Sequence, residues 1–303
     1  MNTEIEFNSL GQMASMTLIL DRVNWVLIGF GSAVCLWLLV QLIRNRQASP
    51  LVAFAPPRGE RLPIEVTVLP VLVLIMVQSL IAPLIARSMT GSDLTDLANP
   101  KTQIVVALSQ NIATVCALLA AYWIGVRYIS QPGCSFVLGR RQVAGDVLTG
   151  VFGALAALAI CQGTLVATQW LIRYFDPLHQ FPEHRVVNLM ISPDQPDWVR
   201  PLMWMGAAVI TPFAEEFFFR GILQTLMTKL IASRWMAIIA AGVLFGFAHS
   251  DQPQVVPAIT AFGIILGVIY ERRGSLTGPI IAHAIFNAKT LLWVTLVPHA
   301  ATS

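Results

Sequence analysis

Charged residues are scarce in this chain of 303 residues. Asp, Glu, Lys and Arg together make up 12% of it, against about 25% in an ordinary soluble domain. Hydrophobic residues make up 56%, so the composition excludes an ordinary water-soluble globule and favours a protein embedded in a lipid bilayer. The net charge of +3 is small and dispersed. A nucleic-acid partner would require Lys and Arg clustered on one face, so we expect no nucleic acid to bind.

Cysteine and the familiar protease motifs are also largely missing. The cysteines form no CxxC pair, and three of them lie in apolar runs; they are Cys35, Cys116, Cys134 and Cys161. We therefore expect neither a disulfide framework nor a zinc-finger-type site. The sequence contains no HExxH and no GxSxG, and no pair of aspartates lies within the apolar runs. These absences argue against several well-known protease chemistries.

Long apolar runs are what the sequence contains instead. A helix of about 20 apolar residues crosses the roughly 30 Å of hydrocarbon in a bilayer. Runs of this kind are predicted at residues 23–43, 65–86, 104–126, 147–174, 199–230, 235–249, 255–270 and 276–297. The predicted fold is all-α, a polytopic transmembrane helical bundle of about eight spans. Residues 1–146 would hold the first three spans and their linkers, and residues 147–303 a bundle with the candidate site.

The basic residues predict an orientation for this integral membrane protein. Eleven of the nineteen Lys and Arg residues fall in alternate loops, which should therefore be cytoplasmic. Both termini would then lie on the other side of the membrane. The first twenty residues carry Glu4 and Glu6 and no Lys or Arg, so they lack the basic segment of a secretory signal and we do not expect one.

Ionisable residues inside membrane spans are costly and often mark function. The fifth run contains the sequence TPFAEEFFFRGIL at residues 211–223. Glu216 and Arg220 are one helical turn apart and can pair, whereas Glu215 is rotated by about 100° and can address a different helix. Pro212 should loosen this helix and free backbone groups beside the carboxylates. The segment alone is compatible with either structural charges or catalysis.

Two further spans carry a His in an i, i+4 pair on one helix face, Phe245 with His249 and His283 with Asn287. Each alone could be structural, since His and Asn also hydrogen-bond between membrane helices. Together with the Glu pair and Arg220 they supply a base, an ion pair and several hydrogen-bond donors. Water activation and oxyanion stabilisation require such groups, so the combination favours catalysis.

Small residues four apart recur in the sixth and seventh spans. Gly242 and Gly246 form one pair, and Gly263 and Gly267 the other. Glycines at this spacing let membrane helices approach closely, so we expect close helix packing at these two spans.

These motifs resemble those of the intramembrane protease family that includes the type II CAAX prenyl endopeptidases, the abortive-infection proteins and bacteriocin-processing or bacteriocin-immunity proteins (CPBP). The three motifs, in order, are EExxxR (Glu215, Glu216, Arg220), FxxxH (Phe245, His249) and HxxxN (His283, Asn287). The resemblance covers residues 199–297. It implies that Glu215 activates the attacking water and that Glu216 and Arg220 support it. It further implies that His249, His283 and Asn287 bind water or metal, or stabilise the oxyanion.

The ligand types leave two mechanisms open. Glu215, His249 and His283 match the Glu and two His of a catalytic zinc site, in which Asn287 would lie outside the metal ligands. The same residues also suit a metal-free mechanism in which Glu215 deprotonates water. A divalent metal such as zinc is therefore a conditional expectation, and no other cofactor is expected.

The predicted function is hydrolysis of peptide bonds in a membrane-associated protein or peptide, within the bilayer. Two alternatives remain open. One is a proton-coupled transporter, because buried Glu and His can relay protons. The other is a membrane scaffold or immunity protein that keeps the motifs without proteolysis.

Overall fold

The computed structural model describes residues 2–44, 76, 80–90, 100–128, 143–181, 197–231 and 233–296. The regular structure of these residues is helical, and no strand occurs among them. The predicted all-α fold is therefore confirmed. In chain order the elements are α1 (Asn2–Arg44), α3 (Ala82–Thr90), α4 (Pro100–Tyr128), α5 (Val143–Phe175), α7 (Val199–Met205), η2 (Gly206–Ile210), α8 (Thr211–Glu216), η3 (Phe217–Gln224), α9 (Thr225–Ile231), α10 (Arg234–Phe247), η4 (Pro253–Val255), α11 (Val256–Arg273) and α12 (Thr277–Leu296).

Among the described residues, four helical segments are long and apolar enough to cross a membrane. They are Thr17–Val40, Val143–Phe175, Val199–Ile231 and Pro253–Arg273. Shorter apolar helices occupy Ile104–Leu119 and Arg234–Phe247, and α12 covers most of the last predicted span. The predicted span at 65–86 lies largely outside the described residues. The all-helical membrane character is thus supported, whereas the count of eight spans is not confirmed, and the orientation of the termini stays a prediction.

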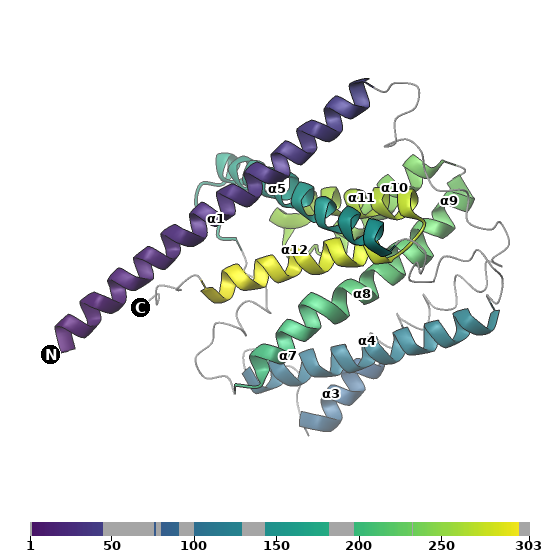
Figure 1. Ribbon diagram of the computed structural model, residues 1–303. Helices are drawn as coiled ribbons and strands as arrows, with labels where there is room; N and C mark the ends of the chain where they lie inside the picture. Colours follow the sequence, from purple (N-terminus) through teal and green to yellow (C-terminus); the bar gives the residue numbers. More distant parts are fainter. Residues whose placement is uncertain are drawn as a thin grey trace.

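A long interrupted helix, Val199–Ile231, runs through the bundle and consists of α7, η2, α8, η3 and α9. Figure 1 shows α12 and α5 on one side of it and α4 on the other. Helices α5, α10, α11 and α12 pack together with η3 around an apolar core that includes Phe219, Phe245 and Phe262. Helix α1 crosses α5 and projects away from the bundle in the same view.

The close helix packing predicted at the two glycine pairs is present in the structure, where α10 packs on α11. A Cβ atom built on Gly263 would lie 2.9 Å from the Cα atom of Gly242, which leaves no room for a side chain at this crossing. A Cβ atom on Gly246 would collide with Thr260. The glycines therefore bring the two helix backbones into contact beside the motif residues.

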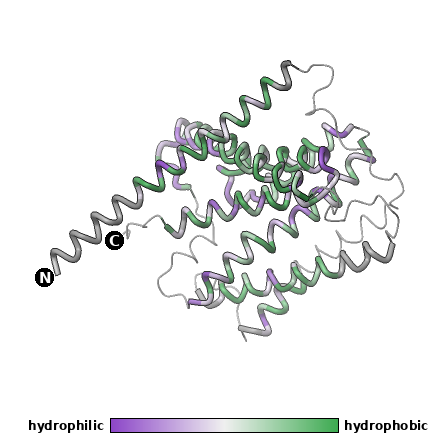
Figure 2. The backbone as a smooth tube through the Cα atoms, in the orientation of Figure 1, coloured by the Kyte–Doolittle hydropathy of each residue, from purple (hydrophilic) through white to green (hydrophobic). Residues whose placement is uncertain are grey.

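Large apolar side chains cover much of the outer surface of the helices. Trp170 on α5 is 67% exposed, and Leu119 on α4 is 63% exposed. Figure 2 shows that apolar residues run along most of the described helices, with polar stretches interspersed. Exposed apolar surface on this scale is expected of helices that face lipid, which agrees with an integral membrane protein.

Candidate active site

Glu216 and Arg220 form a fully buried ion pair inside the long helix. Arg220 Nη1 lies 3.0 Å from Glu216 Oε1, and the two side chains are 1% and 0% exposed, respectively. Arg220 Nη2 also donates to the carbonyl oxygen of Gly263 on α11, at 2.9 Å. The guanidinium carbon lies 4.6 Å from the centre of the Phe245 ring on α10. The pairing predicted from the spacing is present, and Arg220 connects it to two neighbouring helices.

His283 on α12 makes a second contact with the same carboxylate. Its Nδ1 atom lies 2.8 Å from Glu216 Oε1, and the imidazole is buried. The edges or faces of Phe245 and Phe262 pack against the ring, with centroids 5.8 and 5.2 Å away. A carboxylate bound to one ring nitrogen fixes the orientation of an imidazole and leaves the other nitrogen for chemistry. Glu216 therefore orients His283, a role that the sequence spacing within one helix could not reveal.

Glu215 points to the other side of the helix, as its rotation from Glu216 predicts. Its Oε2 atom lies 3.9 Å from His283 Nε2, a distance too long for a direct hydrogen bond. The side chain is 26% exposed and lines a cavity, and Oε2 itself has no hydrogen-bond partner among the described residues. A carboxylate and an imidazole at this separation can both contact one water molecule, as a general base and its partner must.

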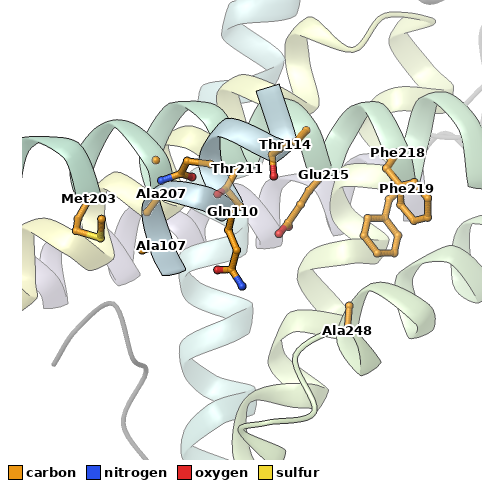
Figure 3. Close-up of a pocket in the computed structure, with 13 residues that line it drawn as sticks. Ala107, Gln110, Thr114, Met203, Ala207, Thr211, Glu215, Phe218, Phe219 and Ala248 are labelled. Atoms are coloured by element: carbon orange, nitrogen blue, oxygen red, sulfur yellow. The ribbon is translucent and has the colours of Figure 1, made fainter. Parts of the chain in front are cut away.

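The cavity beside Glu215 has a volume of about 590 Å³. Figure 3 shows the Glu215 carboxylate near Thr114, with Gln110 on one side and the rings of Phe218 and Phe219 on the other. Its lining residues are Ala107, Gln110, Asn111, Thr114, Met203, Gly206, Ala207, Thr211, Ala214, Glu215, Phe218, Phe219 and Ala248. Helix α4 thus forms one wall, and its polar residues were missed by the sequence analysis.

A polar stripe on the third predicted span was the signal for this wall. Gln110, Asn111 and Thr114 lie within an arc of about 100° on one face of a helix. None of them is ionisable, so a search for charged residues in membrane spans passes over them.

His249 lies at the end of α10, next to Ala248 of the cavity wall. Its Nδ1 atom is 3.0 Å from the carbonyl oxygen of Phe245, one turn earlier in its own chain. That contact leaves Nε2 as the ring nitrogen available to a ligand or substrate. The Phe245 ring packs between His249 and His283, with centroids 5.3 and 5.8 Å away. The FxxxH motif therefore contributes the Phe245 ring, which separates the two imidazoles, as well as the imidazole of His249.

Asn287 contacts the backbone of the long helix rather than His283. Its Nδ2 atom donates to the carbonyl oxygen of Ala207 at 2.8 Å. The Thr211 N–H donates to Gly206 in the π-helical segment η2, and Pro212 has no N–H to offer. The Ala207 carbonyl is thereby deprived of its helical donor, and the amide of Asn287 replaces it. Pro212 thus frees a backbone group, as predicted, but this group lies eight residues, about 12 Å, before Glu215, and Asn287 on α12 satisfies it.

The arrangement of Glu215, His249 and His283 does not fit a three-ligand zinc centre. Zinc requires its protein ligands at about 2 Å from one point. Among the described His, Cys, Asp and Glu residues, no group of three is placed to hold one ion. The contact between His283 and Glu216 resembles the carboxylate–histidine contact that supports metal ligands, so metal dependence stays a prediction for experiment.

Comparison with known proteins supports the class of protein that this site suggests. Residues 197–289 match the family model of the type II CAAX prenyl endopeptidases, Rce1-like. This segment contains every residue of the three motifs, so the match confirms the resemblance predicted from them. The apolar helices support an integral membrane protein, and residues 197–289 are similar to an intramembrane protease family.

Three curated bacterial proteins are similar to parts of the chain. The uncharacterized protein YpbD of Bacillus subtilis is 34% identical over 80 residues, which are 26% of this chain and 39% of that protein. The membrane-embedded CAAX protease MroQ of Staphylococcus aureus is 28% identical over 105 residues, 33% and 42% of the two chains. The UPF0177 protein YaiF of Lactococcus lactis is 22% identical over 206 residues, 68% and 85%. No solved structure matches the chain.

Proposed function

We propose that the protein is an intramembrane endopeptidase that hydrolyses a peptide bond of a membrane-associated protein or peptide. The observation that carries this proposal is that the neighbouring carboxylates of Glu215 and Glu216 lie in different surroundings. Glu216 is buried and bound to Arg220 and His283, whereas Glu215 opens onto a cavity beside the free nitrogen of that histidine. The membrane-embedded CAAX protease MroQ, similar to one third of the chain, supports the same reaction class.

In the proposed reaction, Glu215 acts as the general base. Its carboxylate removes a proton from a water molecule while the water oxygen attacks the carbonyl carbon of the scissile peptide bond. His283 donates its Nδ1–H to Glu216, so its Nε2 faces Glu215 as an acceptor and can hold the other hydrogen of the same water. The arrangement favours attack by an oriented water because Glu216 and Arg220 hold the imidazole in place.

The tetrahedral intermediate then collapses with Glu215 acting as a general acid. The protonated Glu215 carboxyl gives its proton to the departing nitrogen, the carbon–nitrogen bond breaks, and an amine and a carboxylic acid are released. We assign the developing oxyanion to the second N–H of the Asn287 amide. The second amide hydrogen of Asn287 remains for this role because only the first donates to the carbonyl of Ala207. His249 donates its Nδ1–H to the Phe245 carbonyl, so its Nε2 atom is an acceptor and can receive an N–H group of the substrate.

Reconstitution of the purified protein in liposomes with a library of synthetic membrane-associated peptides tests the proposal. We expect mass spectrometry to detect paired products that share one internal cleavage position and that contain one added water. The transporter alternative predicts instead a proton flux driven by substrate, measured with a pH-sensitive dye inside the liposomes. Peptides that remain intact would contradict proteolysis and favour the scaffold alternative.

Metal dependence is tested on the same active preparation. Because the described ligands are not gathered around one point, we expect activity to persist in protein that holds less than stoichiometric metal. Elemental analysis, with turnover measured before and after chelation and after zinc is added back, checks this expectation. Activity that is lost on chelation and restored in proportion to bound zinc would establish the metal-assisted mechanism instead.

A further inference from the structure

Helix α4 has two different faces where it passes the cavity. Gln110, Asn111 and Thr114 line the cavity, together with Ala107. On the opposite side, Ile112 is 44% exposed and Leu119 63% exposed, and both are apolar. The helix therefore presents polar side chains to the cavity beside Glu215 and apolar side chains to its surroundings, which is how a span behaves when it separates lipid from a polar ligand.

Two carboxamides, Gln110 and Asn111, lie on this wall. Neither Gln110 nor Asn111 forms a hydrogen bond with another described residue. A Cβ atom built on Gly206 would lie 2.7 Å from Asn111 Nδ2, so this amide is held closely against the long helix. Gln110 is exposed and Asn111 half-buried, so both amides are accessible from the cavity and can bind a polar group there.

The chemistry of a carboxamide matches that of a peptide bond. Each side-chain amide offers one oxygen acceptor and two hydrogen donors, so it can pair with a backbone N–H and a backbone C=O together. A hydrocarbon chain offers neither group. A phosphate or a carboxylate would be repelled by Glu215, whose carboxylate lines the same cavity.

A substrate cleaved within a membrane requires hydrogen-bond partners for its backbone. The backbone of a membrane helix satisfies its own hydrogen bonds, and water can reach the carbonyl carbon only after that segment unwinds. The unwound N–H and C=O groups then require new partners. Along α4, Gln110 and Thr114 are separated by about 6 Å, since each helical residue rises 1.5 Å. Two residues of an extended chain span a similar length, about 6.6 Å.

We propose that Gln110, Asn111 and Thr114 form a binding wall for the backbone of an extended polypeptide segment, opposite Glu215. This inference rests on the proposed protease function and adds to it the conformation in which the substrate is held. The wall binds main-chain groups and therefore tolerates many side chains, and the substrate lies between α4 and the long helix with its scissile bond beside Glu215.

Binding to an inactive protein tests the wall without requiring turnover. The full chain carrying Glu215→Gln is mixed in detergent with a library of synthetic decapeptides of randomised sequence, capped at both ends, and retained peptide is quantified by mass spectrometry. Adding Gln110→Leu and Asn111→Leu should reduce the retained peptide about tenfold or more, since each lost hydrogen bond weakens binding by roughly two- to tenfold. The matched control places Leu at Ile112 and Val115 on the outward face and should retain as much peptide as the parent.

Equal retention by the wall variant and the control would overturn the proposal, and so would failure of the parent to retain any peptide. Equal competition by farnesol, an uncharged prenyl chain, would instead assign the cavity to hydrocarbon. If the double Leu variant is unstable, Thr114→Val, which keeps the shape of the side chain, provides a second variant for the same binding measurement.

In the active protein, the wall variants should raise KM more than they lower kcat. Unchanged KM in a protein that cleaves would refute the wall alone, whereas full activity of Glu215→Gln would refute the proposed base and leave the wall standing.

Discussion

Two neighbouring carboxylates on different sides of the helix Val199–Ile231 differ in their contacts. On the side that faces α11 and α12, Glu216 Oε1 lies within 3.0 Å of both Arg220 and His283. On the side that faces α4, Glu215 lines a cavity, and neither of its carboxylate oxygens has a hydrogen bond shorter than the 3.9 Å contact with His283 among the described residues. One step along the chain, about 100° of rotation, separates a carboxylate that orders the bundle from one that is available to react.

The packed side continues beyond the site as a series of contacts between the long helix and α11. Arg220 donates to the carbonyl of Gly263, and Gln224, one turn later, donates to the carbonyl of Gly267. Gln224 also donates to Glu271 at 3.1 Å. Donor side chains four residues apart on the long helix thus bind backbone carbonyls four residues apart on α11. On the cavity side, Gln110 and Asn111 of α4 form no such contact with the described residues of the long helix. This difference predicts that substitutions on the packed side change stability, whereas those on the cavity side change activity.

The largest effect is expected from Glu215→Gln. The amide keeps the size of the side chain but cannot take a proton, so kcat should fall by about 10² to 10⁴ while the thermal unfolding temperature in detergent changes little. Glu216→Gln is the matched control on the packed side, and it should lower the unfolding temperature because Arg220 would lose its counter-charge. Retained cleavage by Glu215→Gln would remove the assigned base.

The next largest effect concerns the ion pair. Arg220→Ala leaves the buried carboxylate of Glu216 without its cation, and breaking a buried pair on one side costs about 3 to 5 kcal/mol. We expect a lower free energy of unfolding and lower expression, with partial recovery in the double variant Arg220→Ala/Glu216→Ala. The free energies of unfolding of the single and double variants, measured in detergent, give the interaction energy between Arg220 and Glu216. Losses that simply add would count against a direct pair.

A smaller effect is expected from Asn287→Leu. The substitution removes the donor to the Ala207 carbonyl, which η2 and Pro212 leave without a helical partner, and an unsatisfied buried carbonyl costs about 1 to 3 kcal/mol. Thr290→Val on the same helix is the control, because its hydroxyl only contacts an exposed turn at Phe286. Equal stability of the two variants would show that Asn287 does not brace the long helix.

The sequence predicted the helical fold and the local part of the site. The pairing of Glu216 with Arg220 followed from one turn of spacing, and the opposite direction of Glu215 followed from the helical rotation. The contacts of Glu216 with His283 and of Asn287 with Ala207 join residues 67 and 80 positions apart, and no periodicity within one helix reports such pairs. The same limit applies to the metal, since three ligands on three helices converge only if the helices are placed correctly.

The smallest effect compares a glycine on the packed side with one outside it. A Cβ atom on Gly242 would lie 3.0 Å from the backbone nitrogen of Ile264 and 2.7 Å from its Cγ1, so α10 and α11 must separate slightly to admit a methyl group. Overpacking of this kind costs about 1 to 3 kcal/mol, of which replacing a helical glycine by alanine returns up to about 1. We therefore expect Gly242→Ala to lower the free energy of unfolding by roughly 1 kcal/mol. Gly163→Ala in α5 has no atom within 4 Å of its new Cβ and should be neutral or slightly stabilising, so equal losses at both positions would contradict the close approach of α10 and α11.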